Sequence, residues 1–103
     1  MGYRQDAVKL YGAVPAATYE QVAPLRPLRQ FLVIECDLDT GVSMYVTWGD
    51  LNVETKQAFV LLQPGDCIVF SRSGDMDWRG PVWVSGNGGT TVYRGGETYL
   101  EKT

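Results

Sequence analysis

The feature that most constrains the fold is a series of short alternating segments that begins near Arg29. In residues 30–38 apolar side chains occupy every second position, and residues 42–48 repeat the pattern. A period of two is typical of a β-strand with one buried face. About seven strands are expected in all, the other five at residues 58–62, 67–72, 81–85, 90–94 and 98–100.

Turn-forming residues separate these segments. Asp-Thr-Gly at 39–41 divides the first two and predicts a hairpin, and Pro-Gly at 64–65 suits the centre of a type II turn. The Gly-Gly pair at 95–96 is expected to end one strand before the last begins. Because no segment has the period and length of a normal helix, we predict an all-β fold. It is a single β-sandwich or jelly-roll-like domain over residues 29–103.

Residues 1–28 differ from the rest and are expected to form an extended N-terminal arm. They contain three prolines and no sustained alternation, with room for one short helical turn at residues 19–23. The segment is too apolar for a free tail, so it is expected to wrap its own domain or reach a neighbouring subunit. The candidate assembly contacts are its apolar residues and one loop tryptophan: Leu10, Tyr11, Val14, Tyr19, Leu25 and Trp78.

The charge distribution argues against two classes of partner. The net charge is −3, and no segment concentrates Lys or Arg. Nucleic acids and anionic membranes are bound largely through basic side chains, so neither is expected as a partner. The first ten residues lack the apolar core of a signal peptide, and no apolar run approaches the ~20 residues that span a bilayer. We therefore expect a soluble protein that is made in a cytoplasm.

The sequence contains no histidine, which removes histidine-dependent catalytic triads and the usual zinc and iron sites. The i, i+2 carboxylate pairs at 35/37, 37/39 and 75/77 are interpreted as turn-forming or solvated residues, with an aspartate-based hydrolase as a remote alternative. Residues 37–41 resemble the start of a calcium loop, but the glycine is one position early and Trp48 stands where the twelfth position of the loop needs Glu. No enzyme activity, metal or cofactor is expected.

The two cysteines and several aromatic residues have both structural and functional interpretations. Cys36 and Cys67 are expected to be buried thiols in neighbouring strands, with a disulfide as the alternative in an oxidising setting. Exposed aromatic residues on one sheet face would suit sugar stacking, and the candidates are Tyr45, Trp83 and Tyr93. The simpler interpretation of such residues is cross-strand packing.

The segment from residue 30 to residue 94 resembles small virion proteins of tailed bacteriophages. The similarity lies in the Gln-Pro-Gly-Asp turn at 63–66, the Gly-Pro-Val-Trp-Val-Ser-Gly strand at 80–86 and the Gly-Gly-Thr-Thr-Val segment at 88–92. The resemblance implies a capsid decoration (cement) protein, or a head or tail accessory protein, that acts by assembly and resides in the virion. Its implied partners are capsid or other virion proteins and further copies of itself.

Two functions from different classes follow. The first is a non-enzymatic phage structural protein, most simply a homo-oligomeric capsid decoration or head accessory protein. The alternative is a carbohydrate-binding β-sandwich module for attachment to a host or glycan. An assembled homo-oligomer in solution would favour the first, and a saturable glycan interaction would favour the second.

Overall fold

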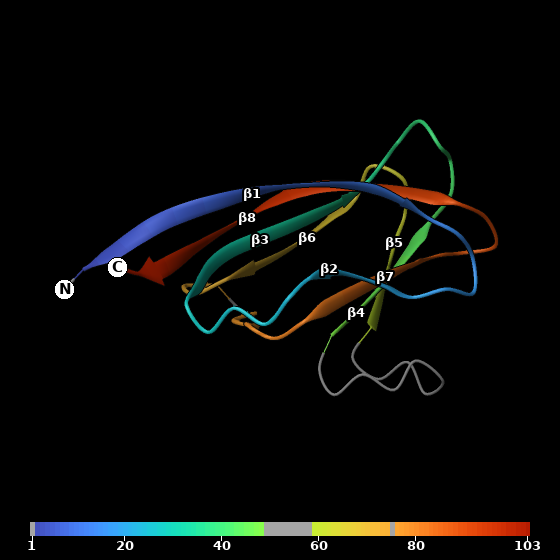
Figure 1. Cartoon of the computed structure of the whole chain (residues 1–103). Helices are drawn as coiled ribbons and strands as arrows, with labels where there is room; N and C mark the ends of the chain where they lie inside the picture. The colour runs from blue at the N-terminus through green and yellow to red at the C-terminus, as the bar shows by residue number, and fades with distance from the viewer. Residues whose placement is uncertain (1, 49–58, 75) are drawn as a thin grey trace.

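Eight β-strands in two antiparallel sheets make up the computed structural model, which describes residues 2–48, 59–74 and 76–103 (Figure 1). Sheet A contains, in spatial order, β1 (Tyr3–Val14), β8 (Thr91–Lys102), β3 (Arg29–Cys36) and β6 (Cys67–Ser71). Sheet B contains β2 (Glu20–Ala23), β7 (Val82–Gly86), β4 (Met44–Trp48) and β5 (Phe59–Leu62). The all-β prediction is confirmed.

The connectivity is that of a jelly roll. The pairs β1–β8, β2–β7, β3–β6 and β4–β5 are all hydrogen-bonded and antiparallel. The chain thus behaves as one long hairpin whose two arms are rolled into a two-sheet sandwich, as in jelly rolls generally. Additional pairing of β3 with β8 and of β4 with β7 joins the rolled arms into two continuous sheets.

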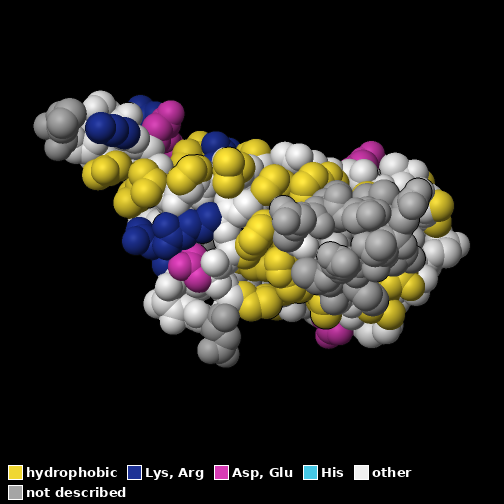
Figure 2. All heavy atoms as spheres, turned by 90° about the horizontal axis from the view of Figure 1, so that it is seen from below, with side chains coloured by type: hydrophobic (Ala, Val, Ile, Leu, Met, Phe, Trp, Pro, Cys, Tyr) yellow, Lys and Arg dark blue, Asp and Glu magenta, His cyan; other side chains and the backbone are white. Residues whose placement is uncertain are grey.

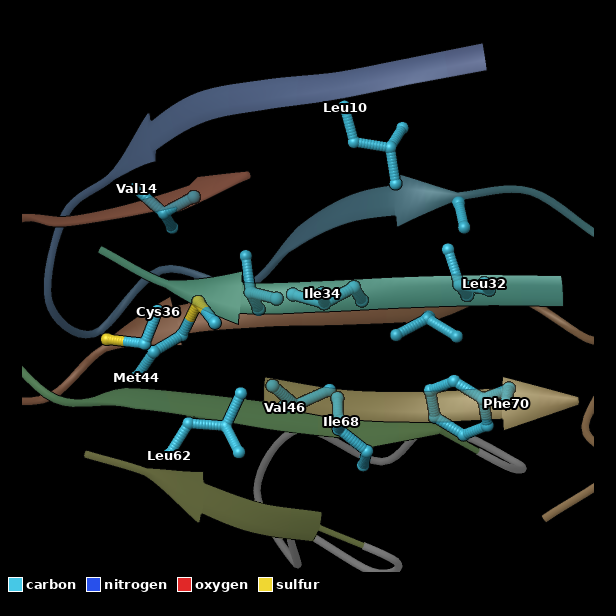
Figure 3. Packing of buried hydrophobic residues seen from close by; sticks show 13 residues of the cluster. Leu10, Val14, Leu32, Ile34, Cys36, Met44, Val46, Leu62, Ile68 and Phe70 are labelled. Atoms are coloured by element: carbon cyan, nitrogen blue, oxygen red, sulfur yellow. The ribbon is translucent and has the colours of Figure 1, made fainter. Parts of the chain in front are cut away.

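The core lies between the two sheets and consists of alternate residues from each strand (Figure 3). In β3 the predicted inner face is confirmed, because Leu32, Ile34 and Cys36 are all fully buried. Trp48 packs against this core with its ring edge toward Phe70, at a centroid distance of 5.3 Å. The buried apolar residues are Leu10, Val14, Ala23, Leu32, Ile34, Cys36, Met44, Val46, Leu62, Ile68, Phe70, Val82 and Val84.

Most of the predicted N-terminal arm is built into the sandwich. The described residues 3–14 form an edge strand of sheet A along the whole of β8, and residues 20–23 form an edge strand of sheet B. The short helical turn expected at 19–23 is therefore wrong. The alternation of β1 was hard to recognise, because Arg4, Asp6 and Gly12 occupy positions on the same face as Leu10 and Val14.

Two predicted connections are also wrong, and one is confirmed. Residues 30–38 and 42–48 do not form a hairpin, because β3 and β4 lie in different sheets. Gly-Gly at 95–96 does not end a strand, because β8 continues through both glycines to residue 102. The turn at 63–66 is as predicted: Gly65 has a φ of 91°, and the Asp66 amide donates to the Gln63 carbonyl at 2.9 Å.

The ends of β1 and β8 project from the body of the sandwich as a two-stranded ribbon (Figure 1). β3 pairs with β8 only as far as Arg29 opposite Tyr99, so the ribbon continues beyond the neighbouring strand. The described chain consequently measures 48 × 29 × 22 Å. The two termini lie side by side at the tip, where the Thr103 amide donates to the Gly2 carbonyl at 3.0 Å.

Candidate functional site

The sheet edges are the most extensive candidate surface for binding another protein. β1 is hydrogen-bonded to β8 along all twelve residues and has no strand on its other side in the described chain. The outer backbone groups of such an edge strand can pair with a strand of another molecule. β6 is the opposite edge of sheet A, and β2 and β5 are the edges of sheet B.

The structure separates the sequence-predicted contact residues into two groups. Leu10 and Val14 point into the core and are at most 8% exposed, so they stabilise the fold and cannot serve as surface contacts. Tyr11 and Leu25 are 70% and 62% exposed. Tyr11 is on the outer face of β1, whereas Leu25 lies in the loop between β2 and β3.

Trp78 is half-buried and closes one end of the sandwich. Its indole N–H donates to the Pro81 carbonyl at 3.0 Å, and its side chain packs against the core. The ring occupies the place that a side chain at residue 80 would need: a β-carbon on Gly80 would lie 2.3 Å from the Trp78 ring. The structure thus shows a packing role for Trp78, which the sequence suggested as a candidate assembly contact.

The outer face of sheet A is partly apolar. Val33 is paired with Val69 of β6, and Phe31 is paired with Ser71 in the adjacent row. Phe31 and Val69 are 40% and 39% exposed. Cys67 lies on the same face at the start of β6 and is exposed, so its predicted burial is wrong.

The two cysteines lie on neighbouring strands, as predicted, but on opposite faces of sheet A. Cys67 is paired with Glu35 and so faces outward with it, whereas Cys36 is buried in the core. Both thiols are free. The Cys36 thiol donates to the Val42 carbonyl at 3.2 Å, and burial raises its pKa.

The tip of the projecting ribbon is charged (Figure 2). Arg4 donates to Asp6 at 3.1 Å within β1 and to Glu101 at 2.8 Å across to β8. The neighbouring Glu101 carboxyl group and the hydrogen bond from Arg4 lower the pKa of Asp6. Beneath the ribbon lies an open groove of about 270 Å³, which includes Leu25 and Tyr99 among its lining residues.

A buried ion pair that the sequence did not indicate ties the base of this ribbon to the sandwich. A β-bulge between Arg29 and Phe31 turns the Arg29 side chain inward, although the alternation of β3 would place it outside. Its Nε donates to Glu97 of β8 at 2.8 Å. Arg26 donates to the second oxygen of Glu97 at 3.2 Å, and its guanidinium lies 3.9 Å from the centre of the Tyr99 ring.

Three carboxylates of the sequence-predicted pairs lie beside arginines, namely Glu35, Asp37 and Asp77. Arg94 donates to Asp37 at 2.6 Å and lies 3.8 Å from Glu35. Arg79 donates to both oxygens of Asp77 and lowers its pKa. Asp75 lies outside the described residues. Among the described residues, no group of three or more potential metal ligands is present.

The three aromatic residues proposed for sugar stacking lie on two different surfaces. Tyr45 and Trp83 are on the outer face of sheet B, in the adjacent strands β4 and β7. Tyr93 is on the inner face of sheet A, where its ring covers Gly12 of the paired strand β1. They therefore do not form one platform. Thr47, which shares the outer face of sheet B with Tyr45, is fully buried.

Tyr45 instead lines a hollow of about 480 Å³ together with Tyr19, a residue that sequence reasoning assigned to assembly. The hollow is lined by residues of the β1–β2 and β7–β8 loops. These loops meet at the end of the molecule opposite the termini (Figure 1). The Gly86 amide donates to the Pro15 carbonyl at 3.2 Å and holds the two loops together. Small residues from both loops, Ala16 and Gly88 among them, leave the hollow open.

No protein-family model matches this chain, and no curated protein sequence matches it. A solved structure with a similar fold comes from work on Bacillus endospore appendages, described as a novel family of disulfide-linked pili. The two chains are 16% identical, and the superposition has a TM-score of 0.54 over 97% of this chain and 89% of the other. At this identity the likeness shows a shared fold. No helix in the described part of the chain is long and apolar enough to cross a membrane.

Proposed function

We propose that this chain is a non-enzymatic structural protein that assembles with other subunits through the edges of its sheets. The observation that carries the proposal is the open edge of β1, twelve residues long and hydrogen-bonded only to β8 within the described chain. A strand from another subunit that adds to this edge gains main-chain hydrogen bonds over its whole length.

The composition of β1 supports strand addition at this edge. Natural edge strands that avoid pairing are short or carry proline, bulges or several charges. β1 is twelve residues long, contains no proline and pairs with β8 without a register shift. It carries three charges, of which Arg4 and Asp6 are paired with each other, and Tyr3 and Tyr11 are 61% and 70% exposed. At the opposite side of sheet A, Phe31 of β3 and Val69 of the edge strand β6 are exposed on the outer face and offer apolar area for a second subunit contact.

The setting that we propose is a bacteriophage virion, with the chain as a capsid decoration or head accessory protein. The sequence resemblance to small virion proteins favours this setting, and jelly rolls are frequent in viral capsids. The pilus protein with the similar fold is also a component of a polymer. A subunit whose two sheet edges differ joins others head to tail, which yields rings or filaments.

Light scattering coupled to size-exclusion chromatography, followed by negative-stain electron microscopy, tests the proposal. The full chain is expected to form a defined oligomer or regular polymer. Ala7→Lys places a charge on the exposed edge of β1 and is expected to weaken association on the order of tenfold. Thr90→Lys, which adds the same charge in an exposed loop, is the matched control and should assemble normally.

A monomer at all concentrations, alone and with purified capsids or tails, would contradict the proposal. Equal association of the two lysine variants would show that β1 is not the assembly edge.

A further inference from the structure

We infer that the hollow between the β1–β2 and β7–β8 loops is a binding site for a neutral sugar ring. This inference is independent of assembly through β1, because the hollow lies on the outer side of sheet B, away from the ribbon. Three observations carry it: an unpartnered hydroxyl, a strained backbone at the rim, and a lining that combines aromatic and uncharged polar groups.

The hydroxyl of Tyr19 is buried and has no hydrogen-bond partner in the described structure. Burial raises its pKa, so at neutral pH the group is a protonated phenol that can both donate and accept a hydrogen bond. A buried polar atom without a partner is unfavourable, and nearly all such atoms in folded proteins are satisfied by protein, water or ligand. The group is covered by the residues around it, so a ligand hydroxyl in the hollow would supply the missing partner once a small rotation of the Tyr19 side chain uncovers the phenol.

The loop that carries Tyr19 is held in a conformation that side chains avoid. Ala17 has a φ of 61°, in the left-handed region that non-glycine residues rarely adopt. The adjacent Ala16 forms a parallel β-bridge with Gly86, which fixes the loop against the end of β7. Strain of this kind persists where the surrounding structure enforces it, and it is concentrated at ligand-binding positions.

The chemical character of the lining selects the class of ligand. None of the described residues that line the hollow is charged, so a charged ligand would find no counter-ion there. Tyr19 and Tyr45 offer aromatic surface, while Ser85 and Asn87 add uncharged hydrogen-bonding groups. A pyranose ring presents apolar C–H faces to aromatic rings and hydroxyls to amides and phenols, and it matches this mixture.

The geometry also explains why Tyr45 alone, of the three residues proposed for sugar stacking, belongs to this site. Trp83 is two positions before Ser85 on β7 and is not among the lining residues. Tyr93 lies on the inner face of the other sheet. The volume, about 480 Å³, is within the range of small-ligand sites and accommodates one or two sugar rings.

Saturation-transfer-difference NMR on the full-length protein tests the site, because the method detects weak ligands on proteins of any assembly state. The probes are glucose, galactose, mannose and N-acetylglucosamine, with the anionic N-acetylneuraminic acid as the charged comparison. At least one neutral sugar is expected to bind saturably. Tyr19→Phe is expected to weaken that binding by about three- to tenfold, the net effect of one hydrogen bond.

The stability of the same variant separates binding from folding. Because the Tyr19 hydroxyl has no partner in the described structure, Tyr19→Phe should unfold at the same urea concentration as the parent or a higher one. Asn87→Ala should also weaken binding, because it removes the side-chain amide from the lining of the hollow. The fold should be retained, because the backbone amide of residue 87 still donates to the Ser43 carbonyl. Tyr93→Phe, which removes a hydroxyl on the other sheet, should bind as the parent does.

Absence of binding by all four neutral sugars would overturn the inference, as would tighter binding of the anionic sugar or unchanged binding by Tyr19→Phe. NMR shifts at residues 16–19 that depend on protein concentration without sugar would show that a second copy fills the hollow, and would also overturn it.

Discussion

Arg29 and Glu97 form an ion pair inside the sandwich, with Arg29 Nε 2.8 Å from a Glu97 oxygen and each residue only 2% exposed. Three further Arg29 N–H groups bond to the carbonyls of Pro24, Trp78 and Gly80. One side chain thus connects the β2–β3 loop, the β6–β7 loop and β8. This connection fixes the end of the sandwich from which the ribbon projects.

Arg29→Met should therefore be strongly destabilising. It leaves Glu97 buried with only Arg26 as a partner and three carbonyls without their donor, and breaking a buried pair in this way costs about 3–5 kcal/mol. Urea denaturation followed by tryptophan fluorescence measures the effect. Combining Arg29→Met with Glu97→Met should cost less than the sum of the two single changes, because the double variant removes both charges of the buried pair and leaves only the partly exposed Arg26 without its carboxylate. Additive effects would show that the two residues act independently.

The strands of this fold could be predicted because their periodicity is local. Leu32, Ile34 and Cys36 alternate within one segment, and all three are buried as that pattern indicates. The partner of each strand could not be predicted in the same way. β3 pairs with β8, some 60 positions later in the chain. The short turn between β3 and β4 has the sequence of a hairpin turn, although it connects a strand of sheet A to a strand of sheet B.

The candidate sites were harder to predict because each combines residues that are distant in sequence. Arg29 faces the core only through a bulge, which the sequence does not mark, and its partner is 68 positions away. The hollow joins Tyr19 from the β1–β2 loop to Tyr45 of β4. Each tyrosine was singled out for a different role, and no sequence pattern links the two.

The paired glycines of β8 should respond very differently to alanine. A β-carbon on Gly95 would lie 1.9 Å from the Val33 carbonyl oxygen, so the backbones of β3 and β8 would have to separate. Such overpacking should destabilise the protein by roughly 3 kcal/mol. A β-carbon on Gly96 meets nothing nearer than the Val8 oxygen at 3.5 Å. Gly96→Ala should be neutral or slightly stabilising, by at most about 1 kcal/mol.

Thermal unfolding of the two alanine variants under identical conditions makes this comparison. Similar melting temperatures for Gly95→Ala and Gly96→Ala would show that the close contact between β3 and β8 is absent in solution.

The two thiols should differ in their reaction with an alkylating agent. Cys67 is exposed at a sheet edge, whereas Cys36 is buried, donates to a carbonyl and has a raised pKa, so little reactive thiolate forms there. Iodoacetamide at pH 7.5 should modify Cys67 and spare Cys36, as read by mass spectrometry of peptides. In 6 M guanidinium both should react. Equal native labelling would mean that the core around Cys36 opens readily.

The stability of the protein should decline in alkaline solution, because three groups have raised pKa values in the folded state. Burial raises the pKa of Cys36 above its usual 9.0 and the pKa values of Tyr19 and Tyr93 above 10.0, so the folded protein retains protons that the unfolded chain releases. This contribution to the free energy of unfolding is fully present below the pKa values that the groups have in the unfolded chain. It is lost as the pH rises through the pKa values of the same groups in the folded protein, by at most about 1.4 kcal/mol per pH unit for each group. Urea midpoints at pH 7, 9, 10 and 11 should fall progressively above pH 9. Tyr93→Phe should show a shallower decline than the parent above pH 10, and an identical decline in the two proteins would show that Tyr93 titrates as it does in the unfolded chain.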